Sequence, residues 1–352
     1  MTLSRVVRPA GPYTLALCTK HASDATRHVR DGTLTTALRV GERVEVGTAR
    51  QTLDGNVVLR AASEEGLERL RFVLAVDADH TEFLRRFARD PLIGETASRF
   101  QGMRQLRMPT VAQTLLRAFC GQLIDSRRAR QLECIIVRAV EPRVEGTDLH
   151  APPTCTSLAR YAPVRLRQLG LHASRAAALV RICRSTDLER LHTLSTAKAA
   201  AFIERQRGLG PWSAGVVCLE GLGRSERGLV GDLTLVKLMS RLRGRWVEAH
   251  ETAELLAPYG EWGGLAGLYL MMGFKHGLIP LPEERPVRFP RQAYARSSSS
   301  SATSRSRRST RSSTRQILAC SAAAEWTARS IVRVVRRSSR NAACSAAATR
   351  ET

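Results

Sequence analysis

Hydrophobic and polar residues alternate along the first part of the chain with the two-residue period of β-strands. In the segment 34–40, Leu34, Thr36, Leu38 and Val40 share one face, and the pair Asp54-Gly55 marks a hairpin before the next apolar run. These runs predict a small antiparallel sheet. The spacing of Leu67, Leu70 and Leu74 is helical, so we expect a helix to cover one face of that sheet. Residues 1–80 are therefore predicted to form a small α/β domain.

From residue 81 to residue 282 the apolar positions follow the helical period. Phe83, Leu84 and Phe87 form one stripe, and Thr110 is placed to cap the helix that begins in "PTVAQTLLRAFCGQLI". Similar stripes recur in the segments 166–169, 177–180 and 199–203. We predict a mainly α protein, in which a helical domain follows the small α/β domain.

The longest apolar run, "GGLAGLYLMMGF" at residues 263–274, is shorter than the roughly 20 residues that cross a membrane. It predicts a buried core helix. The N-terminus has no apolar signal segment, so we expect a cytoplasmic protein without a membrane partner.

Residues 283–352 contain the tract "ARSSSSSATSRSRRSTRSSTRQ", which has too little apolar surface to fold. We predict a disordered Ser/Arg-rich tail. Its composition is compatible with a nucleic-acid-binding arm, but favours a dispensable extension.

The net charge of +23 favours a polyanionic partner. Residues 281–352 hold 15 Arg against 4 Glu, and +12 remains on residues 1–280 without them. Almost all of the basic residues are Arg, which is also typical of GC-rich genomes, so charge by itself is modest evidence for nucleic acid. The eight cysteines form no C-x-x-C pair and the histidines no H-E-x-x-H pattern. We therefore expect neither a metal nor a cofactor.

The segment "RGLGPWSAGVV" predicts a helix-hairpin-helix. Gly208 and Gly210 flank Leu209, and Pro211 suits the first position of the next helix. Backbone amides in such a turn, together with the helix N-terminus, form a site for a phosphate and read no bases. A plain tight turn between two core helices would have the same local sequence.

Asp232 precedes a helical stripe that begins at Leu235, and so falls at the N-cap of that helix. A structural cap is the usual role of an aspartate in this position. The helix N-terminus stabilises a negative charge there, and an anionic carboxylate is what a cationic transition state requires.

Four segments together resemble the helix-hairpin-helix DNA glycosylases, and among them the 3-methyladenine glycosylase II branch. They are "AFCGQLID" at 118–125, "GLGPWSAG" at 208–215, "GDLTLVKL" at 231–238 and "APYGEWGGLAGLY" at 257–269. The resemblance covers about residues 10–282.

This resemblance implies that Asp232 is the catalytic carboxylate. It further implies that Trp212 and Tyr269 contact an extruded base and that Gln122 and Leu123 form the segment that fills the gap in the DNA. The phosphate-binding residues would be Gly208, Leu209, Gly210 and Ser213. Trp212 stands where strand-cutting members have a lysine, which implies a monofunctional enzyme that leaves an abasic site.

We accordingly expect a monomeric, bacterial, nucleoid-associated DNA glycosylase that removes alkylated purines of the 3-methyladenine type from double-stranded DNA in base excision repair. The alternative is a non-catalytic helix-hairpin-helix DNA-binding protein in which Asp232 only caps a helix. Trp212 and Leu123 would then be core residues, and Ser213 a helix-start hydroxyl. A glycosylase for oxidised guanine is disfavoured by Trp212 in place of the lysine.

Overall fold

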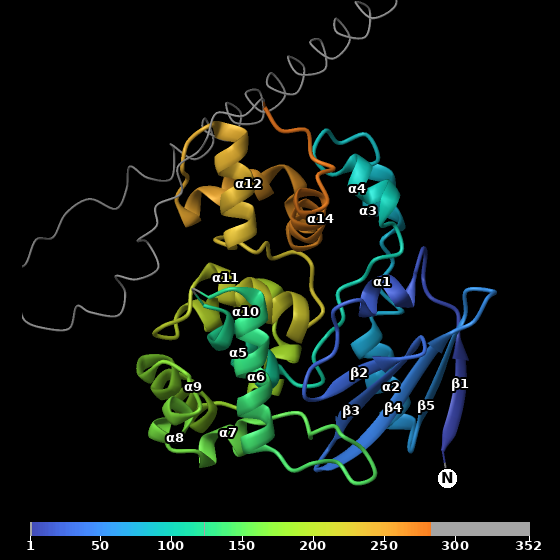
Figure 1. Ribbon diagram of the computed structural model, residues 1–352, viewed down its shortest axis with the longest axis vertical. Coiled ribbons are helices and arrows are strands. Elements are labelled where there is room, and N and C mark those ends of the chain that lie inside the picture. The colour runs from blue at the N-terminus through green and yellow to red at the C-terminus, as the bar shows by residue number, and fades with distance from the viewer. Residues whose placement is uncertain (1, 123, 283–352) are drawn as a thin grey trace, which may run out of the picture.

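The computed structural model describes residues 2–122 and 124–282, in which an antiparallel sheet lies beside a larger helical part (Figure 1). The strands are β1 (Leu3–Val7), β2 (Arg27–Arg30), β3 (Thr33–Val40), β4 (Arg43–Gln51) and β5 (Val57–Ala61). Their order in the sheet is β1-β5-β4-β3-β2. The predicted tail, residues 283–352, falls outside the described residues.

The predicted alternation holds in the sheet, because Leu34, Leu38 and Val40 of β3 are buried. Strand β4 and strand β5 pair in register Ala49↔Leu59 across the predicted hairpin. Helix α2 (Glu64–Leu74) packs across β3, β4 and β5, as its leucine spacing predicts. Strand β1, which the sequence pattern did not predict, closes the free edge of β5.

The rest of the described chain is helical. The helices are α1 (Leu15–Thr19), α3 (Thr81–Arg86), α4 (Gly94–Arg99), α5 (Val111–Gly121), α6 (Ser126–Val140), α7 (Cys155–Arg160), α8 (Pro163–Gln168), α9 (Ala173–Ser185), α10 (Thr196–Glu204), α11 (Pro211–Val216), α12 (Leu233–Arg243), α13 (Thr252–Leu256) and α14 (Gly263–Lys275). Short helical segments are η1 (Leu188–Thr193), η2 (Val217–Gly221), η3 (Ala249–Glu251) and η4 (Ala257–Trp262). None of the described helices is long and apolar enough to cross a membrane.

The helical part contains two hydrophobic cores. Helices α5 to α10 surround the first core, whereas α3, α4 and α12 to α14 surround the second. Helix α11 and segment η2 serve both, since Val217 and Cys218 face the first core while Val216 and Leu219 face the second. The helix that follows the hairpin therefore lies at the junction of the two cores.

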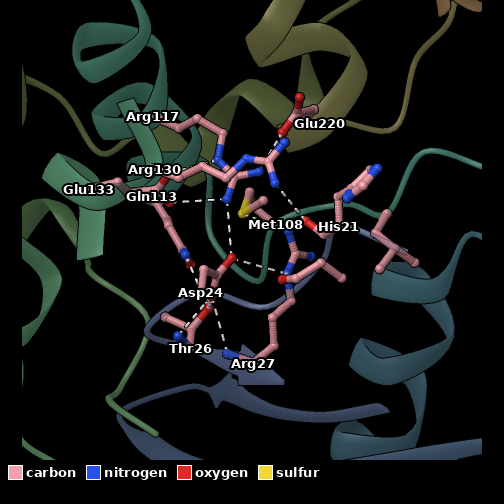
Figure 2. Close-up of polar contacts among 12 residues, drawn as sticks. His21, Asp24, Thr26, Arg27, Met108, Gln113, Arg117, Arg130, Glu133 and Glu220 are labelled. Atoms are coloured by element: carbon pink, nitrogen blue, oxygen red, sulfur yellow. Dashed lines mark hydrogen bonds and ion pairs between the residues drawn. The ribbon is translucent and has the colours of Figure 1, made fainter. Parts of the chain in front are cut away.

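A buried ionic cluster connects the N-terminal segment to the helical part (Figure 2). We define it as Asp24, Arg27, Arg117, Glu133 and Glu220. The Arg117 guanidinium on α5 donates to Glu133 at 2.9 Å, to Glu220 at 3.0 Å and to Asp24 at 3.1 Å. Arg27 also donates to Asp24, at 3.1 Å. These contacts fix α6 and η2 against the chain that enters the sheet.

Candidate functional site

The hairpin lies between α10 and α11, where the sequence predicts it. Gly208 has a φ of +93°, a conformation that side chains disfavour, so a glycine is required at this position. Gly210 is extended, with a φ of −138°, and is the N-cap of α11. Pro211 then begins the helix, as its fixed φ and missing N–H allow.

The predicted phosphate-binding residues differ in whether their backbone N–H group is free to donate a hydrogen bond to a phosphate. The Leu209 amide already donates to Gln206 at 3.0 Å, and its side chain is buried in the first core. Trp212 and Ser213 instead lie in the first turn of α11, where an amide has no intrahelical acceptor. The turn can therefore offer an anion the amides of Gly210, Trp212 and Ser213, whereas the Leu209 amide is already used.

Asp232 is the N-cap of α12, as predicted. Its Oδ1 accepts a hydrogen bond from the Thr234 amide at 2.8 Å. The turn before it needs a glycine, because Gly231 has a φ of +89°. The Gly231 amide donates to Thr252 Oγ1 at 2.7 Å, so α13 holds the turn in place. No sequence pattern singles out Thr252.

The second carboxylate oxygen of Asp232 faces the hairpin. Trp212 Nε1 donates to Asp232 Oδ2 at 3.1 Å. Both residues are half-buried. A carboxylate oxygen can accept two hydrogen bonds, so each oxygen keeps room for one more donor. The structure thus joins the two residues that the sequence places 20 positions apart.

Gly121 allows the Trp212 ring to lie against the end of α5. A Cβ at this glycine would stand 2.8 Å from Trp212 Cη2, closer than side-chain contacts normally allow. Gly121 belongs to the "AFCGQLID" segment, in which no role is predicted for it. Its lack of a side chain leaves room for the Trp212 ring at the end of α5.

Gln122 also contacts the hairpin. Its Nε2 donates to the Gly208 carbonyl at 2.8 Å and reaches Ser213 Oγ at 3.4 Å. Ser213 is 2% exposed, and its hydroxyl faces Gln122. Leu123, the predicted inserted residue, lies outside the described residues.

Tyr269 does not share this surface. It is fully buried in the second core, with its ring 5.2 Å from that of Phe83. The Tyr269 hydroxyl donates to the Phe100 carbonyl at 3.2 Å. A side chain without exposed surface has no face to offer a base, so the prediction that Tyr269 binds one receives no support from its position.

Metal ligands do not gather at this site. Across residues 2–122 and 124–282, no group of three or more His, Cys, Asp or Glu side chains could hold an ion. The two groups that contact the Asp232 carboxylate, the Thr234 amide and Trp212 Nε1, are N–H donors. The site therefore combines one half-buried carboxylate, an indole N–H and the free amides of a helix start.

The chain is similar to known DNA glycosylases in sequence. It is 24% identical over 275 residues to the DNA-3-methyladenine glycosylase of Bacillus subtilis (strain 168), which covers 73% of this chain and 91% of that protein. No model of a protein family matches the chain.

Solved structures show the same likeness in three dimensions. The 3-methyladenine DNA-glycosylase of Archaeoglobus fulgidus superposes with a TM-score of 0.69 at 21% identity, covering 77% of this chain and 98% of that one. The 8-oxoguanine glycosylase/lyase of Clostridium acetobutylicum, solved with double-stranded DNA, gives a TM-score of 0.65 at 18% identity, over 79% and 98%. The resemblance to the helix-hairpin-helix DNA glycosylases is thereby confirmed, and the chain has the fold that these two enzymes share.

Proposed function

We propose that this protein is a monomeric, monofunctional DNA glycosylase that removes alkylated purines of the 3-methyladenine type from double-stranded DNA in base excision repair. The observation that carries the proposal is the 3.1 Å contact between Trp212 Nε1 and Asp232 Oδ2. It directs a carboxylate toward the hairpin that would hold the DNA strand. The named activity of the Bacillus subtilis relative supports the substrate class.

In this proposal the amides of Gly210, Trp212 and Ser213 hold a phosphate, and the Gln122-Leu123 segment fills the space that the extruded nucleotide leaves. Water adds to C1′ while the C1′–N bond breaks, and the base leaves with the bonding electron pair. Asp232 stabilises the positive sugar and accepts the proton of the water. An alkylated purine is already cationic and leaves as a neutral base, so one carboxylate suffices.

The product would be an abasic site in an uncut strand. Strand cutting by a glycosylase needs an amine that forms a Schiff base with the sugar. An indole nitrogen is no such nucleophile, and Trp212 occupies the lysine position of the hairpin. Trp212 instead offers an aromatic surface to an electron-poor base.

The second candidate is a DNA-binding protein without catalysis. It is favoured by the fact that Asp232 Oδ1 caps α12 while Oδ2 holds Trp212, so the carboxylate already has two structural tasks. Both functions use the same hairpin. Only chemistry at the sugar separates them.

The substitution Asp232→Asn tests the choice, because asparagine still caps a helix but carries no charge. We expect release of methylated base from treated duplex DNA to fall by about 100-fold or more, with duplex affinity retained. Asp187→Asn is the matched control, since Asp187 caps η1 through Glu189 far along the chain from the site. Equal release by wild type and Asp232→Asn would reject catalysis by Asp232. A wild-type protein that binds the duplex but releases no base would favour the second candidate.

A further inference from the structure

A surface cavity of about 710 Å³ lies along α6. We call it the α6 cavity and define it by His21, Arg127, Arg130, Cys134, Arg138 and Lys275. The residues come from the loop after α1, from α6 and from the last residue of α14. None of them belongs to the Asp232–Trp212 site.

The α6 cavity is strongly cationic. It is lined by Arg127, Arg130, Arg138 and Lys275, and no acidic residue of the described chain lines it. The three arginines fall on one face of α6, where residues three or four apart are neighbours. From Arg127 to Arg138 the helix rises roughly 16 Å. The cations thus form an extended row, which suits a linear polyanion better than a small anion.

Two contacts hold α6 and its Arg130 side chain in position. On its inner side α6 is fixed by Glu133, which accepts from Arg117 in the buried ionic cluster at 2.9 Å. On the cavity side Arg130 Nη1 donates to the His21 carbonyl at 3.1 Å. Figure 2 shows Arg130, Glu133 and Arg117 in the same close-up. Arg130, held in this way, loses little conformational freedom when it binds.

The cavity begins close to the proposed DNA contact. Ser126 is the first residue of α6 and also lines the cavity. It follows Gln122 by four residues, which span at most about 14 Å of extended chain. Gln122 itself holds the hairpin through Gly208. One strand of DNA presents a phosphate about every 3.4 Å of helix axis, so about four phosphates of one strand span that distance.

We propose that the α6 cavity binds backbone phosphates of the same DNA duplex that the hairpin holds, and so extends the DNA-binding surface beyond the proposed catalytic site. The inference rests on the proposed function only in taking duplex DNA as the partner. Phosphate contacts of this kind position the duplex and carry no sequence information. The α6 cavity therefore acts on affinity and not on the bond-breaking step.

The first test is the salt dependence of binding to an undamaged duplex, with the full chain. The variant Arg127→Gln/Arg138→Gln/Lys275→Gln removes three charges from the cavity and leaves Arg130 to hold His21. The control Arg43→Gln/Arg50→Gln/Arg60→Gln removes three exposed charges from β4 and β5. We expect the slope of log K against log[salt] to fall by about two to three in the cavity variant, with a loss of affinity of about tenfold or more. The control should match wild type. Equal effects of both variants, or none from the cavity variant, would overturn the proposal.

Single-turnover release of methylated base separates this inference from the proposed function. At saturating enzyme the cavity variant should release base at the wild-type rate, whereas Asp232→Asn should lose the rate and keep the salt slope. A cavity variant that fails at saturation would contradict a role in affinity. A further outcome is that the wild type releases no base while the cavity variant still shows a smaller slope of log K against log[salt]. In that case the proposed glycosylase function is wrong, and DNA binding by the α6 cavity is supported.

A second test needs no substitution in the cavity. Burial, and then Arg130, Lys20 and Lys275, lower the pKa of His21. Phosphates in the α6 cavity would offset these cations and raise that pKa, which NMR titration of the His21 ring can follow with and without an undamaged duplex. His172, exposed at the start of α9, serves as the reference ring. An equal His21 titration in both states would overturn the proposal.

Discussion

Among single residues, Trp212 and Asp232 matter most, because their contact orients the Asp232 carboxylate toward the hairpin. The Thr234 amide donates the cap hydrogen bond to Asp232 Oδ1 and holds that oxygen. The Trp212 indole N–H donates to Asp232 Oδ2 and holds the other oxygen. Hydrogen bonds to charged groups contribute about 1.5–3 kcal/mol, enough to keep a side chain in one orientation. Trp212 is thus expected to position Asp232 as well as to contact the base.

The substitution Trp212→Phe removes that donor and keeps an aromatic ring. We expect base release to fall by about tenfold, because 1.4 kcal/mol of lost positioning corresponds to one decade in rate. Trp262→Phe is the control, since Trp262 Nε1 is buried without a partner in the described structure. Single-turnover release by both variants measures the effect. Unchanged release by Trp212→Phe would show that the N–H does not position the carboxylate.

At the scale of elements, His80 marks the passage from the sheet to the helices. It is the N-cap of α3 and is 9% exposed. Burial, and then Arg104 and Arg107, lower the pKa of His80 to about 3. Because an unfolded histidine has a pKa of about 6.5, the unfolded chain binds this proton first as the pH falls. The stability that the neutral ring contributes is complete above pH 6.5 and is lost between pH 6.5 and 3.

Unfolding by urea at several pH values tests this element. Between pH 7 and pH 5, protonation of His80 in the unfolded chain should reduce the free energy of unfolding by about 2 kcal/mol. The variant His80→Gln should lack that part of the pH dependence, while the buried carboxylates still titrate in both proteins. The difference between the two curves therefore isolates His80. Parallel curves would mean that the ring titrates normally in the folded protein.

At the scale of the whole molecule, the buried ionic cluster couples the parts that carry the candidate site and the α6 cavity. Asp24 and Glu133 are almost fully buried, with side chains 3% and 2% exposed. Burial raises the pKa of Asp24, but Arg27 and Arg117 outweigh it and lower that pKa. The cluster holds together because each buried charge has an opposite charge beside it.

The substitution Arg117→Met leaves Glu133 and Asp24 without their shared partner. We expect the free energy of unfolding to fall by about 3–5 kcal/mol, the usual result of breaking a buried pair from one side. Arg85→Met is the control, because Arg85 pairs with Glu82 on an exposed surface and should cost less than about 1 kcal/mol. Thermal or urea unfolding measures both. Losses of similar size would mean that the cluster contributes no more than a surface pair.

Local features were predictable from the sequence because nearby residues determine them. The hairpin between β4 and β5, the cap of α5 by Thr110 and the cap of α12 by Asp232 all occur as predicted. Each depends on backbone groups within a few positions. The need for glycine at 208 is of the same kind.

The contacts that form the candidate site depend on the tertiary structure. Trp212 and Asp232 lie 20 positions apart and Gln122 and Gly208 lie 86 apart, so only the packing of α5, α11 and α12 brings them into contact. For the same reason the helical pattern could not tell the buried Tyr269 from a base-binding ring, since one apolar stripe serves a core or a pocket. Most of the helices and strands, and the helix caps, follow from the sequence alone because they are local. The division of the helices into two cores, the ionic cluster and the contacts around Asp232 were decided by tertiary packing, because they join residues that the chain keeps far apart.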